Sequence, residues 1–124
     1  MSKTPLRISF AGGGSDYFNS RSDLPGKVIV STINKYMYVC LNKKYNSEIR
    51  AAYSFTENVK NTHKLNHDII REALKLHKII NGVEISTLAD IPSSGSGLAS
   101  SSALAVGLSH VIREFQSLKI SKTL

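Results

Sequence analysis

The sequence has little cysteine, few prolines and few aromatic residues. Its 124 residues include one cysteine, three prolines, five tyrosines, four phenylalanines and no tryptophan. The single cysteine, Cys40, has no partner for an internal disulfide, which excludes a small domain held together by disulfide bonds. Cys40 stands in an apolar-rich stretch, so we expect it to be a buried thiol of the core.

Long hydrophobic runs are also absent. No apolar stretch approaches the roughly 18 residues that a membrane-spanning helix needs. The N-terminus leads into a glycine cluster rather than into the apolar region of a signal peptide. We therefore expect a cytoplasmic protein that has no membrane partner.

Positive charge exceeds negative charge in this chain. It has 16 basic and 9 acidic residues, with a formal net charge of +7. Such an excess attracts nucleic acids, anionic membranes or phosphorylated small molecules. The basic residues are scattered, without a dense arginine run or interleaved aromatic residues. We expect no nucleic-acid partner, although an RNA-binding module stays an alternative.

The hydrophobic pattern predicts one domain, residues 1–124, of the α+β class. No repeat, low-complexity segment or linker divides the chain. Alternating and helical spacings of apolar residues separate strands from helices. The predicted strands are 6–11, 27–33, 36–42, 48–55 and 83–88, and the predicted helices are 67–80 and 99–115. We expect a turn near Asn34 and Lys35 between the second and third strands, and a loop over residues 56–66.

The segment before the second predicted helix is rich in serine and glycine. Six of the ten residues from Ser93 to Ser102 are serines, and Gly95 and Gly97 allow backbone amides to approach a ligand closely. The segment leads into a helix N-terminus, which attracts anions, and a serine hydroxyl can bind Mg²⁺. A simple helix cap needs only one serine. The pattern therefore favours a phosphate-binding loop.

Two motifs resemble the signatures of the GHMP kinases, the superfamily of galactokinase, homoserine kinase and mevalonate kinase. The first of them is Pro5-Leu6-Arg7-Ile8-Ser9-Phe10-Ala11-Gly12-Gly13-Gly14-Ser15-Asp16-Tyr17. The second is Pro92-x-x-Gly95-Ser96-Gly97-Leu98-Ala99-Ser100-Ser101-Ser102-Ala103. They stand in the order that the family has. Together they identify the chain as similar to the N-terminal part of a GHMP kinase.

Within that superfamily the sequence is most similar to the D-glycero-D-manno-heptose 7-phosphate kinase branch. The similarity includes the glycine triplet of the first motif and the stretches around Pro25 and Lys35. The resemblance implies an ATP-dependent kinase that phosphorylates the anomeric hydroxyl of that sugar phosphate. A fucokinase- or galactokinase-like enzyme and a non-catalytic nucleotide-binding module are the alternatives.

The resemblance also implies site residues. The ATP phosphates would be bound by Pro92, Gly95, Ser96, Gly97, Leu98, Ala99, Ser100, Ser101 and Ser102. Ser101 would also be the Mg²⁺ ligand, and Arg7 would be a catalytic cation near the transferred phosphate. Asp16, Gly13 and Gly14 would contact the sugar or sugar-phosphate substrate.

The family fold implies further expectations for this chain. The N-terminal domain of GHMP kinases is related to a domain of a ribosomal protein and contains a left-handed βαβ crossover, against the usual right-handed rule. Family members are longer, with a third signature, an aspartate that acts in catalysis and a ferredoxin-like C-terminal domain. We therefore expect an incomplete kinase without that second domain, which is inactive by itself.

Overall fold

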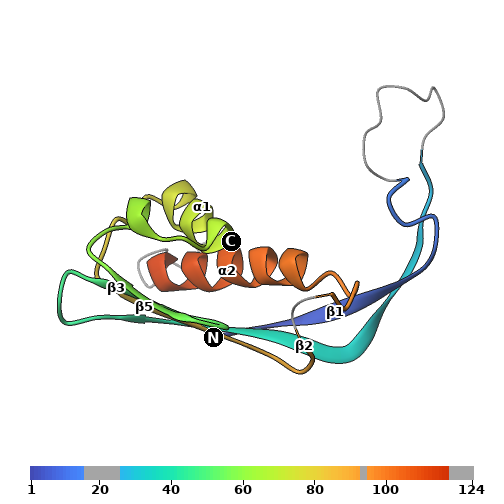
Figure 1. Ribbon diagram of the computed structural model, residues 1–124, viewed down its shortest axis with the longest axis horizontal. Helices are drawn as coiled ribbons and strands as arrows, with labels where there is room; N and C mark the ends of the chain where they lie inside the picture. Colours follow the sequence, from blue (N-terminus) through green and yellow to red (C-terminus); the bar gives the residue numbers. More distant parts are fainter. Residues whose placement is uncertain (16–25, 93–94, 118–124) are drawn as a thin grey trace.

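The protein is a mixed α+β domain in which a five-stranded sheet carries two helices on one face (Figure 1). The computed structural model describes residues 1–15, 26–92 and 95–117. Its strands are β1 (Ser2–Ala11), β2 (Ile29–Lys43), β3 (Ile49–Ala52), β4 (Thr56–Val59) and β5 (Val83–Ala89). Its helices are α1 (Asp68–Leu76), α2 (Ser100–Ser117) and the short 3₁₀ helix η1 (Thr62–Lys64). The predicted α+β class is confirmed.

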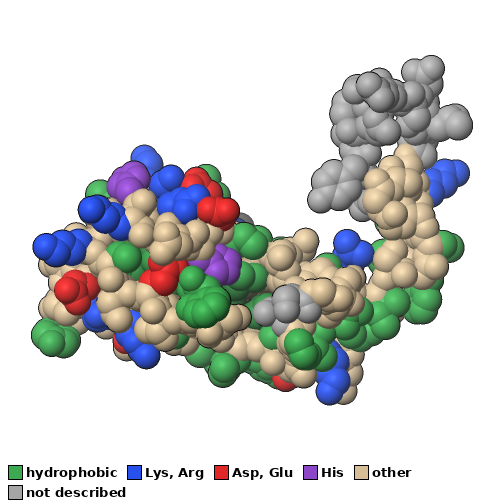
Figure 2. All heavy atoms as spheres, viewed as in Figure 1, with side chains coloured by type: hydrophobic (Ala, Val, Ile, Leu, Met, Phe, Trp, Pro, Cys, Tyr) green, Lys and Arg blue, Asp and Glu red, His purple; other side chains and the backbone are tan. Residues whose placement is uncertain are grey.

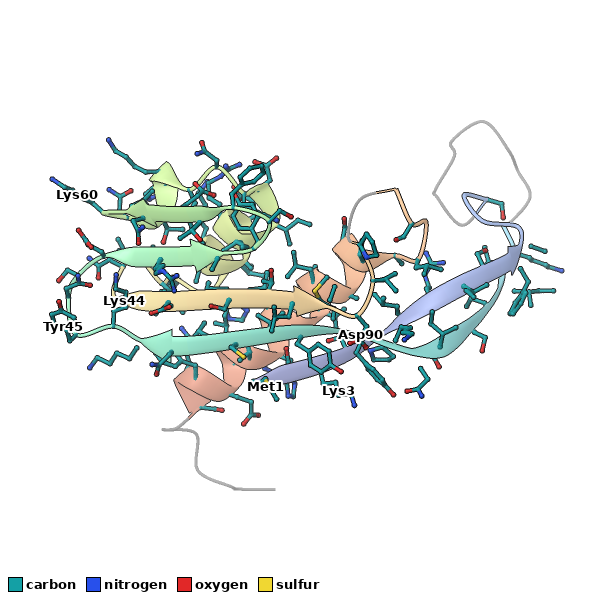
Figure 3. The ribbon with its side chains drawn as sticks, turned by 60° about the horizontal axis from the view of Figure 1, so that its bottom comes forward. Met1, Lys3, Lys44, Tyr45, Lys60 and Asp90 are labelled. Carbon is teal, nitrogen blue, oxygen red and sulfur yellow. The ribbon has the colours of Figure 1, made fainter. Side chains whose placement is uncertain are left out.

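The strand order in the sheet is β1-β2-β5-β3-β4. β3 and β5 run parallel, and the chain between them passes through β4 and α1. The pairs β1–β2, β2–β5 and β3–β4 are antiparallel. The uncovered face of the sheet is polar in part, because the Lys3 ammonium lies there 3.9 Å from the centroid of the Tyr36 ring (Figure 3).

The core lies between the sheet and the two helices. Leu6, Ile85 and Ile112 are fully buried there, and each such side chain contributes roughly 1.5–3 kcal/mol through burial. α2 lies unusually near the sheet at Gly107, where a Cβ atom would be 3.0 Å from the Ser2 hydroxyl oxygen. That hydroxyl donates a hydrogen bond of 2.9 Å to the Gly107 carbonyl. The glycine therefore sets how closely α2 packs on β1.

The turn expected near Asn34 and Lys35 is wrong. A single strand, β2, runs from Ile29 to Lys43 through this point. Pro5 and Arg7 of β1 pair with Tyr36 and Thr32, so three residues of β2 lie opposite one residue of β1. Asn34 and Lys35 therefore mark an irregularity that bends β2, and the chain does not reverse there.

The loop expected over residues 56–66 is also corrected. Four of its residues form the edge strand β4, which pairs with β3 from Ala52↔Thr56 to Ile49↔Val59. Three others form η1. β4 reads Thr-Glu-Asn-Val, and only its last residue is apolar, so hydrophobic alternation gives no signal for it.

Helix α1 ends earlier than its apolar spacing predicts. Lys78 adopts a left-handed conformation with φ 57°, and the Ile79 N–H donates to the Leu74 carbonyl at 2.9 Å. This is the closing hydrogen bond of a Schellman motif, in which the left-handed residue is usually glycine. A lysine in that position gives no sequence signal for the helix end.

The expected burial of Cys40 is wrong as well. The thiol is only half buried. Its neighbour Val39 contacts Gly107 of α2, and successive side chains of a strand point to opposite faces. Cys40 therefore belongs to the uncovered face of the sheet.

The end of β1 and the start of β2 leave the sheet as a two-stranded arm, defined here as residues 9–15 and 26–31 (Figure 1). Hydrophobic side chains lie on its surface (Figure 2), where Phe10 is 69% and Ile29 is 65% exposed. The helices cover the rest of the sheet but not the arm. The molecule thus has a packed body and a thin extension.

Candidate functional site

The loop before α2 has the backbone of a ligand-binding turn. Gly95 and Gly97 have φ angles of 75° and 67°, in the left-handed region that glycine adopts without strain. Ala99 shares this conformation with φ 58°, although it carries a Cβ. A strained residue directly before a helix is a common feature of functional sites.

The first turn of α2 presents hydroxyl groups at its N-terminus. Ser101 and Ser102 are exposed, whereas Ser100 is buried. The helix begins with the hydrogen bond from the Ala103 N–H to the Ala99 carbonyl. Ala99 has no side-chain oxygen and so supplies no capping group to the first-turn amides. The residue directly before the helix is therefore an alanine and not the serine that a simple cap would use.

The start of the loop is fixed by the end of β5. Asp90 follows β5 (Figure 3), and its carboxylate accepts a hydrogen bond of 2.8 Å from the Tyr36 N–H. Pro92 is exposed, and Ser93 and Ser94 lie outside the described residues. Within the loop, the Ser96 hydroxyl accepts a hydrogen bond from the Leu98 N–H at 3.5 Å.

Arg7 lies beside the same loop. Its backbone N–H donates to the Leu98 carbonyl at 3.2 Å, which ties the middle of β1 to the residues before α2. The Arg7 side chain is half buried, and the ion pairs of the described residues do not include it. The structure therefore brings the backbone of Arg7 next to the residues that precede α2.

The glycine triplet of the first motif lies at the tip of the arm. Gly12 has φ 75°, and the Ser15 N–H donates to its carbonyl at 3.0 Å. Gly13 and Gly14 are exposed in this turn. Gly12 follows Arg7 by five positions along an extended chain, a path of roughly 16 Å. The glycine turn of the arm and the loop before α2 lie toward the same end of the molecule, but they are separate in space (Figure 1). Asp16 lies outside the described residues.

A pocket of about 300 Å³, which the sequence motifs do not indicate, adjoins the loop. Pro92 and Leu104 of the loop and α2 form one side of it, and Tyr53 and His67 form another. The two aromatic rings are edge to face, with centroids 4.6 Å apart. Tyr53 follows β3 and His67 precedes α1, so only the fold brings them together.

Glu57 of β4 lies behind the Tyr53 ring. The Tyr53 hydroxyl donates to its carboxylate at 2.6 Å. Partial burial favours the neutral carboxyl, but hydrogen bonds from Tyr53 and from the Asn66 and His67 backbones outweigh it and lower the pKa of Glu57. The hydrogen bond to Glu57 and partial burial raise the pKa of Tyr53. Both groups therefore stay in their ordinary charge states at neutral pH.

Comparison with known proteins connects this geometry to a family. The family model "GHMP kinases N terminal domain" matches residues 50–124, which include the loop, α2 and all of the pocket lining except Met37. A curated relative, the D-glycero-alpha-D-manno-heptose 7-phosphate kinase of Campylobacter jejuni, is 30% identical over 97% of this chain and 39% of its own length. The chain thus spans about two fifths of that relative.

Solved structures agree in fold. A D-glycero-D-manno-heptose 1-phosphate kinase from Bacteriodes thetaiotaomicron superimposes with a TM-score of 0.78 at 28% identity, over 93% of this chain and 41% of that one. The mevalonate kinase of Methanococcus jannaschii has a TM-score of 0.68 at 17% identity, over 99% of this chain and 41% of that one, which shows a shared fold alone. The part of the chain that the structure describes contains no helix long and apolar enough to cross a membrane. The family model, the curated relative and the solved structures together show that the chain belongs to the GHMP kinases and has the fold of their N-terminal domain.

Proposed function

We propose that the protein is a sugar kinase that transfers the γ-phosphate of ATP to a hydroxyl of D-glycero-D-manno-heptose 7-phosphate, with residues 1–124 as its ATP-binding domain. The observation that carries this proposal is the left-handed loop over Gly95, Gly97 and Ala99, which leads into a helix whose preceding residue has no capping side chain. Such a helix N-terminus favours phosphate through its amides and its dipole.

The loop and α2 supply the phosphate site. Gly95 and Gly97 expose backbone amides to the phosphate oxygens, and Ser101 and Ser102 add exposed hydroxyls. The hydroxyl of Ser101 is a hard oxygen donor and fits Mg²⁺, which usually keeps few protein ligands and shares the phosphates of the nucleotide. Mg²⁺ held there would neutralise phosphate charge during transfer.

The pocket beside the loop is proposed to hold the nucleotide base. It begins at Pro92, the first residue of the phosphate loop, and has an aromatic side formed by Tyr53 and His67. A ligand with its phosphates at the helix N-terminus would therefore place its base between this side and Leu104. The two subsites are contiguous, as one nucleotide requires.

Arg7 is the proposed catalytic cation. Its backbone is tied to Leu98 of the loop, and a guanidinium near the bound phosphates would compensate negative charge on the phosphoryl group in transfer. The sugar hydroxyl oxygen forms a bond to the γ-phosphorus while the bond to the β,γ-bridging oxygen breaks and ADP leaves. The hydroxyl proton passes to water or to a general base. Positioning and charge compensation carry most of the catalysis in such reactions.

The sugar is proposed to lie on the side of the arm. Gly13, Gly14 and Asp16 belong to the first motif, which follows Arg7 along β1. The names of two relatives, a heptose 7-phosphate kinase and a heptose 1-phosphate kinase, support a heptose phosphate as the acceptor. Because ATP and sugar phosphates are cytoplasmic metabolites, we propose a cytoplasmic enzyme.

The test is ADP release by the full-length protein with Mg²⁺, ATP and D-glycero-D-manno-heptose 7-phosphate. We expect turnover with this sugar, and a loss of about 100-fold or more in kcat for Ser101→Ala, on the scale of removing one stabilising group from a transition state. Ser109→Ala is the matched control, because Ser109 lies two turns further along α2. Equal activity of the wild type and Ser101→Ala would contradict the phosphate site.

A further inference from the structure

The aromatic side of the pocket is assembled from two elements that a single carboxylate joins. Glu57 of β4 accepts hydrogen bonds from the Tyr53 hydroxyl at 2.6 Å, the Asn66 N–H at 2.8 Å and the His67 N–H at 3.3 Å. Tyr53 lies in the turn between β3 and β4, and His67 is the N-cap of α1. Glu57 therefore fixes the turn against the start of the helix.

The same contacts restrict the two rings. The Tyr53 ring is held at its hydroxyl by Glu57 and packs edge to face on His67 and Phe55, at 4.6 Å and 6.2 Å between centroids. The imidazole Nδ1 of His67 accepts the Ile70 N–H at 3.5 Å. Neither ring is free to turn away from the pocket without breaking one of these contacts.

We propose that Glu57 is a positioning residue for the nucleotide base, acting through Tyr53 and His67 without touching the ligand. This inference rests on the proposed function, because it assigns the pocket to the base of the bound nucleotide. Rings that are already fixed lose little conformational freedom when a base packs against them, and this raises affinity. Glu57 contacts the Tyr53 hydroxyl and the Asn66 N–H and does not line the pocket. The phosphates, in contrast, are assigned to the Gly95 loop. Its effect should therefore depend on the base and not on the phosphate chain.

Two ligands separate these effects. Calorimetry on the protein with Mg²⁺ compares ATP, which has a base, with inorganic tripolyphosphate, which lacks one. Tyr53→Phe keeps the ring and removes only the hydroxyl that Glu57 holds, and Glu57→Gln keeps the shape and removes the charge. We expect each variant to weaken ATP binding by about three- to tenfold, the scale of one hydrogen bond, with tripolyphosphate binding unchanged within about twofold.

A matched control is available elsewhere in the sheet. Glu84 of β5 pairs with Arg50 of β3, so Glu84→Gln also removes one paired carboxylate, but away from the pocket. We expect this variant to bind both ligands as the wild type does. Thermal unfolding of all variants shows which of them are folded at the temperature of the binding measurement.

The outcomes are distinct. Weaker binding of ATP alone in Tyr53→Phe and Glu57→Gln supports the proposal. Equal weakening of both ligands shows a general structural role for Glu57 and overturns it, as does unchanged ATP affinity in both variants. A wild type that binds tripolyphosphate as tightly as ATP overturns the base pocket but leaves the phosphate loop. A wild type that binds neither ligand overturns the proposed function itself.

Discussion

The body and the arm of this molecule use the same two strands in different ways. In the body, β1 and β2 lie under α2, and side chains such as Leu6 and Val39 are fully buried. In the arm, the same strands continue as a two-stranded ribbon with Phe10 and Ile29 exposed. An isolated two-stranded ribbon is at best marginally stable in water. Buried side chains therefore stabilise the body, whereas the arm depends on the backbone hydrogen bonds between its two strands and on its glycine turn.

This difference separates the proposed site into a rigid part and a thin part. The phosphate loop, Arg7 and the pocket all lie on the body, where the sheet and two helices fix them. The glycine turn of the first motif lies at the tip of the arm. We infer that the proposed nucleotide site is formed in advance by packing, while the position of the glycines proposed to contact the sugar is set by a weakly supported element.

The largest expected effect separates the core of the body from the surface of the arm. Ile112→Ala removes a fully buried side chain of α2 and should lower the free energy of unfolding by about 2–5 kcal/mol. Phe10→Ala removes a larger side chain from the arm and should change it by about 0.5 kcal/mol or less, because that ring is already exposed to water. Urea unfolding followed by circular dichroism measures both. A decrease in the free energy of unfolding as large in Phe10→Ala as in Ile112→Ala would mean that the Phe10 ring is buried against other residues in solution.

A second prediction concerns the turn at the tip of the arm. A Cβ at Gly12 would overlap the Lys27 carbonyl oxygen, and φ is 75°, so Gly12→Ala should destabilise the turn by about 1–3 kcal/mol. Gly14 has φ 92° but no atom within 4 Å of the position that a Cβ would occupy, so Gly14→Ala is the matched variant with backbone strain alone, about 1 kcal/mol. Hydrogen exchange of the arm amides should rise more in Gly12→Ala, while the amides of α2 keep their protection. Equal exchange in the two variants would contradict the overlap with Lys27.

Much of the fold could be predicted from the sequence because its elements have regular apolar spacing. α2, β5 and α1 follow from that spacing, as does the α+β class. The parts that could not be predicted lack a local signal. β4 is short and mostly polar, and α1 is ended by Lys78 where the usual residue is glycine. Asn34 and Lys35 do mark an irregular place in the chain. Whether such a pair reverses the chain or only bends a strand depends on pairing with β1, which the local sequence does not show.

The candidate site divides in a similar way. The serine and glycine pattern predicts a turn with left-handed glycines before a helix N-terminus, which Gly95 and Gly97 form, because glycine conformation and helix polarity are local properties. Phosphate binding by this loop stays a prediction. The pocket could not be predicted, because Tyr53 and His67 come from separate elements and meet only through the sheet. Glu57 gave no signal either, since an acidic residue in a polar stretch resembles any surface position. A tyrosine in a tight turn, with a glutamate four residues later on the following strand, would be the pattern to look for.

The smallest expected effect is a pH dependence of stability that the body has and the arm lacks. The pKa of Glu57 is lowered in the folded protein, so its contribution to stability is present above its ordinary value near 4.5 and is lost as pH falls through the lower folded value. The described part of the arm has no acidic residue, so it has no such dependence. Unfolding of the wild type and of Glu57→Gln from pH 7 to pH 3 should therefore show a difference in stability that shrinks in acid. Arm amide exchange, corrected for its intrinsic dependence on pH, should stay the same in both proteins, because Glu57 supports only the body. A difference that is constant over the whole range would mean that the hydrogen bonds of Glu57 do not depend on its charge.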